Sequence, residues 1–372
     1  MENRNRSRVS RTVMLLVVIA LISTVFPLCA FAEKKDVLIL HSYHKGYKWV
    51  DDENSGIESV LKSETWQKAV NLQIEYLDAK RVSGDAYLQQ VSDVFKQRFA
   101  NRPISLLIAT DDDAFNFLLK YREKIFGAPI PIVFCGVNNL EATDPRITTY
   151  KNVTGVNEET DFKGDIELIL KIHPETKKIV IINDTTTTGQ RIKSVISGFS
   201  QNYSDLVKFE FLDDLDLQQA AEKLKKLPGY SIVLYTIYSR DKSGKFYEMN
   251  ESNTIITQAS SVPVYGAWDF SMGTGIVGGL LTSGFAQGQA AGEIAARILG
   301  GESVEKIPVL MKSPNKYMFD WKQLDRWNIK ISQLPADSSF VNKPKYSLIH
   351  ISLIGAGILI LLAFGYIYKK VI

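Results

Sequence analysis

The chain has 372 residues, of which 45% are hydrophobic and 23% are charged, so it is long enough for two lobes of ordinary domain size. Its formal net charge is +3, but residues 1–32 hold four arginines and one glutamate, which leaves the remainder without net charge. This balance argues against nucleic acid or an anionic lipid surface as the main partner.

The N-terminus has the pattern of a secretory signal. Residues 1–11 carry the four arginines, an apolar run follows, and Ala30 and Ala32 supply the small residues of an A-x-A cleavage site. We predict a signal peptide over 1–32 that is cleaved after Ala32. The alternatives are an uncleaved anchor and a lipoprotein signal at Cys29, which the two residues before that cysteine disfavour.

Short apolar runs alternate with amphipathic stretches along the exported part, which indicates an α/β fold with mainly parallel sheets and two lobes. The first lobe is expected over 33–153. A helical stripe is expected to bury Tyr87, Val94 and Phe99, and Thr110 or Asp111 is expected to cap a helix. Strands are predicted over 36–42, 72–79, 104–110 and 130–139, and helices over 51–64, 84–99 and 111–121.

The second series is expected over 154–283, with a polar turn at 185–190. Asp216 and Gln219 have the spacing of a capping box at the start of one helix. Strands are predicted over 177–184, 207–212, 230–238 and 262–270, and helices over 162–172, 191–199 and 215–227.

The C-terminus holds a second apolar run, over 347–368, that contains no Asp, Glu, Lys or Arg. Its length matches the thickness of a bilayer core, and Lys369 and Lys370 supply a positive flank. We predict one transmembrane helix here that runs outward to inward, with only four residues beyond it. The predicted location is therefore the cell membrane, single-pass, with the binding domain exported.

Polar and aromatic residues follow nearly every predicted strand. Parallel sheets place ligand sites outside the carboxyl ends of their strands, so two facing lobes would form a cleft that recognises a small polar organic ligand reversibly. In the loop after the first strand, Tyr43, Tyr47 and Trp49 would supply rings. The predicted ligand-binding residues are Ser42, Tyr43, His44, Trp49, Thr110, Asp111, Asn138, Thr186, Tyr235, Trp268 and Asp269.

Metal and enzyme sites find little support in the sequence. His41 and His44 lack the third and fourth ligands of a transition-metal site, and "TDDDAF" lacks the spacing of a calcium loop. There is no G-x-S-x-G, no Walker loop and no G-x-G-x-x-G after the first strand. Cys135 has no histidine nearby in sequence and is expected to pack as a small apolar residue. We predict no catalysis, no metal and no cofactor.

The segment "GGLLTSGFAQGQAAGEIAARILGGESVEKIPV" resembles the closing segment of ABC-type substrate-binding proteins with the type I periplasmic-binding fold. "LHSYHKGYKWVDDENSGI", "ATDDDAFNFL", "PIVFCGVNN" and "YMFDWKQLDRWNI" are similar to a narrower group, the exported sensor modules of membrane histidine kinases and diguanylate cyclases. The resemblance implies two Rossmann-like lobes joined by three hinge crossings, near Val153, Ser283 and Pro308. It returns 284–307 to the first lobe and adds 308–345 to the second.

This resemblance also implies a function. It matches Ser42, Tyr43, Trp49, Thr110, Asp111, Asn138 and Trp268 with positions that face the cleft. The expected protein binds a small solute outside the cytoplasm, is anchored by one membrane helix, and is the ligand-sensing input of a transmembrane signalling system with a kinase or cyclase partner. The alternative is a membrane-tethered receptor that delivers solute to an ABC permease.

Overall fold

The computed structural model describes residues 34–138, 140–344, 359–362 and 364–366. The predicted signal peptide lies outside these residues, and so does most of the predicted membrane helix. The pieces of that helix that are described, 359–362 and 364–366, are helical. No helix within the described part of the chain has both the length and the apolar character needed to cross a membrane.

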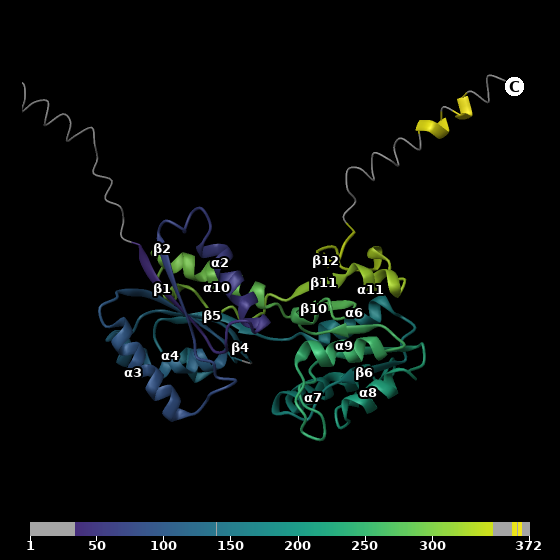
Figure 1. Cartoon of the computed structure of the whole chain (residues 1–372), viewed down its shortest axis with the longest axis horizontal. Coiled ribbons are helices and arrows are strands. Elements are labelled where there is room, and N and C mark those ends of the chain that lie inside the picture. The colour runs from purple at the N-terminus through teal and green to yellow at the C-terminus, as the bar shows by residue number, and fades with distance from the viewer. Residues whose placement is uncertain (1–33, 139, 345–358, 363, 367–372) are drawn as a thin grey trace, which may run out of the picture.

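Two lobes lie side by side, each built on a parallel sheet with helices on both faces (Figure 1). This confirms the predicted α/β fold. The sheet of the first lobe has the strand order β2-β1-β3-β4-β5. Its strands are β1 (Lys35–His41), β2 (Val70–Tyr76), β3 (Ile104–Thr110), β4 (Ile132–Asn138) and β5 (Val153–Glu158).

Alternation along β1 divides the first lobe into two cores. Leu38 and Leu40 pack on the side of α3 and α4, whereas Val37 and Ile39 pack on the side of α2 and α10. The helices of this lobe are α2 (Lys48–Leu61), α3 (Asp85–Phe99), α4 (Asp111–Phe126), α5 (Pro145–Thr148) and α10 (Gly284–Leu299).

The second lobe has a parallel sheet with the order β7-β6-β8-β9 and a small third sheet, β10-β11-β12. In the third sheet β11 runs antiparallel to β10 and parallel to β12. The strands are β6 (Lys178–Ile182), β7 (Lys208–Leu212), β8 (Ser231–Tyr235), β9 (Val264–Gly266), β10 (Gly278–Leu281), β11 (Lys316–Asp320) and β12 (Ser339–Val341). The helices are α6 (Phe162–Ile172), α7 (Thr187–Ser200), α8 (Leu217–Leu224), α9 (Met249–Ala259) and α11 (Trp321–Arg326).

The chain passes between the lobes three times. It leaves the first sheet after β5, returns between β10 and α10, and leaves again after a segment beside β5, where Val156 bridges to Leu310. The crossing segments are thus 159–161, 282–283 and 312–315. The predicted crossing near Ser283 falls in the second of these segments. Val153 begins β5, and Pro308 precedes the bridge of Leu310 to that strand, so both lie a few residues before the crossing segments. The predicted domain boundaries stay predictions.

Several local predictions were wrong for physical reasons. The side chain of Thr110 makes no capping bond to α4; instead its Oγ1 lies 2.9 Å from His41 Nδ1, and the hydroxyl of Ser42 accepts a bond from Ala114 N. Val94 is exposed. The turn at 185–190 is partly helical, because α7 already begins at residue 187. The polar helix α9 and strands β11 and β12 were not predicted.

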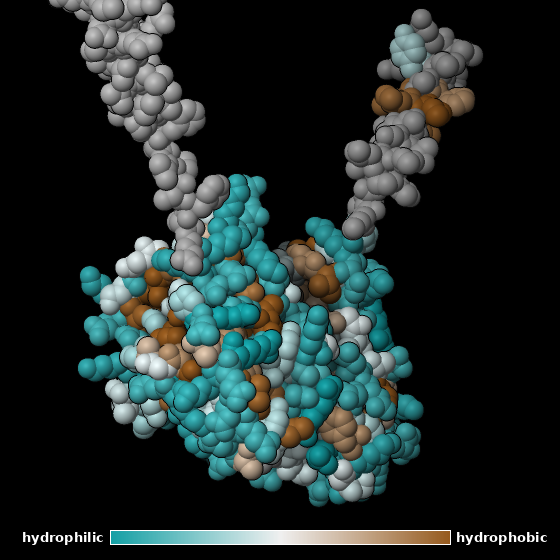
Figure 2. Space-filling view, turned by 60° about the vertical axis from the view of Figure 1, so that its left-hand side comes forward, coloured by the Kyte–Doolittle hydropathy of each residue, from teal (hydrophilic) through white to brown (hydrophobic). Residues whose placement is uncertain are grey.

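Other local predictions are confirmed. The capping box at α8 has both of its bonds, since Asp216 Oδ1 accepts from Gln219 N and Gln219 Oε1 accepts from Asp216 N. Cys135 is buried in an apolar core, as expected. The face of the molecule in Figure 2 is mainly hydrophilic, with apolar residues in smaller groups between.

Glycines allow α10 to pack closely against α2. A Cβ built at Gly56 would lie 2.2 Å from the carbonyl oxygen of Phe285, and one at Gly288 would lie 1.9 Å from that of Glu53. Both obstacles are backbone atoms, which cannot move without shifting a helix. α10, which follows β10 of the second lobe in the sequence, therefore completes the first lobe only because these positions lack side chains.

We expect Gly288→Ala to lower the free energy of unfolding by about 2 kcal/mol or more, because the methyl group would force α2 and α10 apart. Urea unfolding of the full chain measures this. Gly198→Ala is the matched control, since a Cβ at that exposed position in α7 meets no atom within 4 Å. It should leave stability unchanged or raise it by about 0.5–1 kcal/mol. Equal effects of the two substitutions would contradict the close contact.

Candidate ligand-binding cleft

A cavity of about 430 Å³ lies between the two lobes, within the size range of sites for small organic molecules. Its first-lobe wall comes from the carboxyl ends of β1, β4 and β5 and the start of α4. Its second-lobe wall comes from α6, α7 and the segment after β9. The lining residues are Tyr43, Asp112, Asn138, Glu158, Glu159, Thr160, Phe162, Thr188, Arg191, Ile192, Val195 and Trp268.

Aromatic rings form one side of this cavity. The Trp268 ring packs edge-on against Phe162, with 5.9 Å between the ring centroids, and stacks on Phe270 at 6.1 Å with 14° between the planes. Trp268 Nε1 donates to Glu158 Oε1 at 3.2 Å. This bond fixes the indole from one lobe against a carboxyl from the other, so the ring presents a fixed flat face to a ligand.

A second cavity, of about 180 Å³, lies next to the first. Two ring pairs separate them: Trp268 and Tyr43 line the larger cavity, while their partners Phe270 and Tyr47 line the smaller one. The smaller cavity is also shared between the lobes. Its other lining residues are His44, Gly46, Lys48 and Trp49 from the first lobe and Glu248, Met249 and Asn250 from the second.

The larger cavity is rich in carboxyl groups. Asp112 accepts hydrogen bonds from Arg146 at 2.8 Å and from the backbone nitrogen of Asn138 at 3.2 Å. Among the described residues, Glu158 and Glu159 form no ion pair. Arg191 is the positive side chain of the lining, and it too has no ion pair within the described part of the chain. The cavity therefore offers separate sites for a cation and an anion.

Buried carboxyl groups also lie behind the cavity wall. Glu53 and Asp111 converge on Gly136, where an added Cβ would lie 2.3 Å from Glu53 Oε1 and 3.1 Å from Asp111 Oδ1. Burial raises the pKa of Asp111 to about 7, and burial together with the negative charge of Asp111 raises the pKa of Glu158 to about 8. The pKa of Glu53 is also raised well above its usual range by burial. Near neutral pH these three buried carboxyl groups, which form the floor of the cleft, therefore keep protons that water-exposed carboxyl groups would release.

One face of α7 supplies the second-lobe wall. Thr188, Arg191, Ile192 and Val195 follow the i, i+3, i+4, i+7 spacing of one helical stripe. Thr186 caps this helix by accepting from Gly189 N at 3.2 Å, so it positions the wall rather than lining it. The predicted elements divide this stripe between the turn at 185–190, which holds Thr188, and the helix over 191–199.

The structure separates the predicted residues into two groups. Tyr43, Asn138 and Trp268 line the larger cavity, and His44 and Trp49 line the smaller one. The others line neither cavity: Ser42, Thr110, Asp111, Thr186, Tyr235 and Asp269.

Residues of the second group support the walls from within each lobe. The Ser42 hydroxyl donates to Thr110 O at 2.7 Å and is fully buried. Asp111 accepts from Trp49 Nε1 at 2.9 Å and thereby holds the ring of the smaller cavity. Tyr235 lies in the core of the second lobe, with its hydroxyl 3.0 Å from Ser252 Oγ. Strand ends thus supply both lining and supporting residues, and only the packing decides which.

Asp269 lies at the second crossing between the lobes. Its backbone nitrogen donates to Thr282 O, and burial raises the pKa of its carboxyl to about 6. His41 is equally internal, with Nδ1 2.9 Å from Thr110 Oγ1 and Nε2 3.3 Å from Asn54 Oδ1. Among the described residues, no group of three or more His, Cys, Asp or Glu side chains is placed to hold a metal ion.

Several cleft residues were missed by sequence reasoning. Glu158 ends β5 and Glu159 follows it. This segment was treated only as the boundary between the lobes, although polar residues after a strand were the signal used elsewhere. Phe270 directly follows the predicted pair Trp268 and Asp269. Glu248 belongs to the start of the unpredicted helix α9, so no signal pointed to it.

The sequence model of one protein family, described as "ABC transporter substrate binding protein", matches residues 48–335. No curated protein matches the chain. Solved structures that are similar to it have the type I periplasmic-binding fold. One is the ligand-free, open structure of a substrate binding protein with adhesive properties from Clostridium difficile, at 17% identity and a TM-score of 0.58, which covers 83% of this chain and 100% of that one.

Two further structures are similar to this chain. A conserved domain protein from Vibrio cholerae matches at 16% identity with a TM-score of 0.52, over 83% of this chain and 99% of that one. An ABC domain from Streptococcus pneumonia in complex with L-Trp matches at 16% identity with a TM-score of 0.50, over 82% of this chain and 99% of that one. At these identities the likeness shows the fold.

The raised pKa values of Asp111 and Glu158 make stability depend on pH. Both carboxyls keep a proton in the folded state that the unfolded chain has already lost, so their contribution is lost as pH rises through about 7 and 8. We expect the free energy of unfolding to fall by about 2 kcal/mol between pH 6.5 and 8.5. His41, whose pKa burial lowers to about 4, acts only below this window.

Urea unfolding at a series of pH values measures this effect. Glu158→Gln should remove much of the slope, because an amide does not titrate. Glu159→Gln, the exposed neighbour, should keep it. A stability that stays constant or increases over this window would show that the buried carboxyls are already ionised.

Proposed function

The chain belongs to the family of ABC transporter substrate binding proteins, and on this premise we propose that it binds a small organic solute reversibly in the cleft between its lobes. The observation that supports this most directly is the 430 Å³ cavity, whose walls come from both lobes. A solute that touches both walls stabilises the closed state by its differential affinity for that state. The solute is released unchanged, as expected of a binding protein.

We propose that the solute carries a cationic group and a flat apolar part. The lining holds three carboxyl groups, on Asp112, Glu158 and Glu159, against the single guanidinium of Arg191. Glu158 and Glu159 have no cation partner among the described residues, and Glu158 would ionise when a cation binds. Trp268 and the neighbouring rings suit a planar group. An amino acid with an aromatic side chain satisfies each of these features, with its carboxylate on Arg191. The L-Trp bound to the similar streptococcal domain supports this class.

We further propose an exported protein that is anchored by the apolar run at 347–368 and acts as the sensing input of a transmembrane signalling system. The third crossing supports a signalling path. It runs from the edge of β5, which ends at the cleft residue Glu158, through 312–315 into β11 and on towards the apolar run. Movement of the first lobe relative to the second would therefore act on the crossing 312–315, which continues into the part of the second lobe that precedes the apolar run.

The second candidate is a tethered receptor that delivers solute to an ABC importer, which the family description favours. Cross-linking of the full chain in its native membrane separates the two roles. Capture of a kinase or cyclase would support the sensor, and capture of a permease would support the receptor.

A thermal-shift screen of the chain against amino acids and aromatic amines tests the proposed site. A ligand at one hundred times its dissociation constant should stabilise the protein by about 2.7 kcal/mol. Trp268→Ala should then lower the affinity about 30-fold or more, since it removes a central ring of the cavity. Arg191→Ala should lower the affinity for a ligand that has a carboxylate. Unchanged affinity in both variants would show that the solute binds elsewhere.

Two substitutions serve as matched controls for these variants. Tyr230→Ala removes an exposed ring outside the cleft, and Lys193→Ala removes a cation from the same helix as Arg191. Neither should change the affinity for the ligand.

The affinity for a cationic ligand should rise with pH. Ligand binds the ionised form of Glu158, whose pKa in the empty protein is about 8, so binding below that pH must release a proton. We expect the association constant to increase about tenfold or more between pH 6 and 8. Calorimetry in buffers of different ionisation enthalpy measures the released proton, which Glu158→Gln should abolish. An affinity that falls as pH rises would exclude a cationic ligand at Glu158.

A further inference from the structure

Residues 33–372 carry no net charge as a whole, but 312–343 hold a local excess of positive charge. Residues 312–343 contain six Lys and Arg against three Asp, and one of these acids, Asp320, is buried. Lys322, Arg326 and Lys343 are exposed and take part in no ion pair found among the described residues. These three cations are therefore not neutralised by any ion pair in the described part of the chain.

Two of these cations, Arg326 and Lys343, lie over aromatic rings. Arg326 is 4.6 Å from the ring centroid of Trp327, and Lys343 Nζ is 5.4 Å from that of Trp321 and 5.9 Å from that of Phe340. The three rings are half-buried, so part of each remains accessible. Cations above partly exposed tryptophans are the side-chain combination that favours the headgroup region of a bilayer.

A polar cavity of about 250 Å³ opens beside the same residues. Lys322 and Arg326 line it together with the loop Gly273–Gly275 and Asn342. The buried carboxylate of Asp320 is already used, since it accepts from Lys322 N and from Asn342 Nδ2. The two cations therefore remain available to an outside anion.

Chain length sets how far this surface can be from a membrane. The described stretch that contains these residues ends at 344, and the uncharged run begins at 347, so three residues span at most about 10 Å. A headgroup layer is itself about 5–8 Å thick. If 347–368 spans the bilayer, Lys343 and the rings beneath it must lie in or next to the headgroups.

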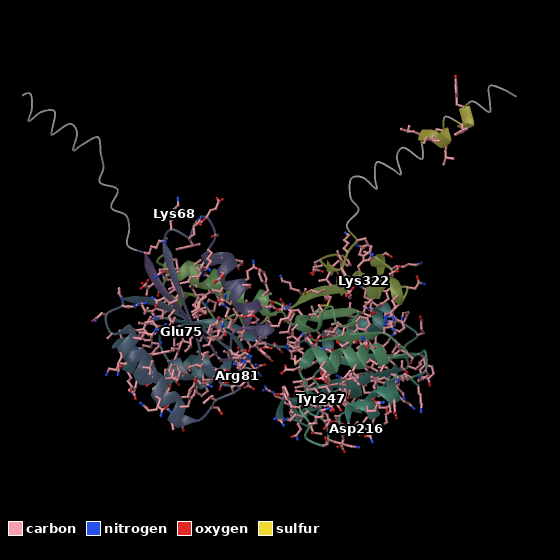
Figure 3. The ribbon with its side chains drawn as sticks, in the orientation of Figure 1. Lys68, Glu75, Arg81, Asp216, Tyr247 and Lys322 are labelled. Carbon is pink, nitrogen blue, oxygen red and sulfur yellow. The ribbon has the colours of Figure 1, made fainter. Side chains whose placement is uncertain are left out.

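We propose that this surface, formed by Lys322, Arg326 and Lys343 over Trp321 and Trp327, docks on the anionic headgroups of the membrane that anchors the chain. The proposal rests on the proposed anchor. Because β11, α11 and β12 pack with the second lobe, docking holds that lobe at the membrane and leaves the first lobe to move when ligand binds. Figure 3 shows Lys322 at one pole of the second lobe and Asp216, at the start of α8, at the other.

Lysine footprinting of the full chain in lipid nanodiscs tests the docking. In discs with about one-third phosphatidylglycerol, acetylation of Lys322 and Lys343 should be about threefold or more slower than in pure phosphatidylcholine, and high salt should restore it. Lys223 and Lys226 are internal controls whose rates should not change, since they lie on and next to α8, which is at the far pole of the second lobe in Figure 1. Equal rates for Lys322 and Lys343 in both lipids would overturn the proposal.

Charge reversal provides the second measurement. The double variant K322E/R326E should remove the lipid-dependent protection of Lys343, while K223E/K226E should keep it. Protection of Lys343 that survives K322E/R326E would show that the anchor alone causes it.

Flotation with phosphatidylcholine vesicles at high salt tests membrane insertion of the anchor separately from docking. A chain that fails to float there has no anchor. The docking surface then still predicts flotation with phosphatidylglycerol vesicles at low salt, lost in K322E/R326E, and no flotation in that case would overturn it.

Discussion

The close contact between α2 and α10 is the constraint on which the rest of the structure depends. Gly56 and Gly288 let the two helix backbones come into contact, so α10, which follows most of the second lobe in the sequence, covers one face of the first sheet. Once the first lobe is built from two distant segments, the chain must cross between the lobes more than once. Glu158 and Asp269 lie beside these crossings and therefore at the junction between the lobes. Their position depends on both lobes.

One buried side chain connects these crossings. Gln287 of α10 accepts from Gly136 N at 3.2 Å and donates to Asn157 O at 3.1 Å and to Ser313 Oγ at 2.9 Å. It thereby joins the end of β4, the end of β5 and the third crossing through one amide. Buried polar networks of this kind hold when every member is satisfied, and they specify one arrangement of the segments they join. The cleft floor and the segment that leads to the C-terminus therefore share a rigid support.

The charge of the cleft follows from where these segments end. Several carboxyls gather at the carboxyl ends of neighbouring strands, and burial raises the pKa of those that water cannot reach. The proposed cationic solute would replace the missing solvation of these carboxyl groups and so offset the free energy that their burial costs in the empty protein. Ring pairs divide the cleft into two cavities, and each pair has one ring in each cavity. A solute that displaces a ring in one cavity would therefore also displace its partner ring in the other.

The sequence by itself determined the fold class and much of the alternation, because period-2 and period-3.6 patterns of apolar residues reflect burial within one lobe. It also indicated Tyr43, Asn138 and Trp268, since strand ends of parallel sheets are local features. Only the tertiary structure decided that Tyr235 faces a core and Glu158 faces the cleft. Both residues end a buried strand, and which of them meets the other lobe depends on how the three crossings orient the two sheets, a relation between segments far apart in the chain that no local pattern records.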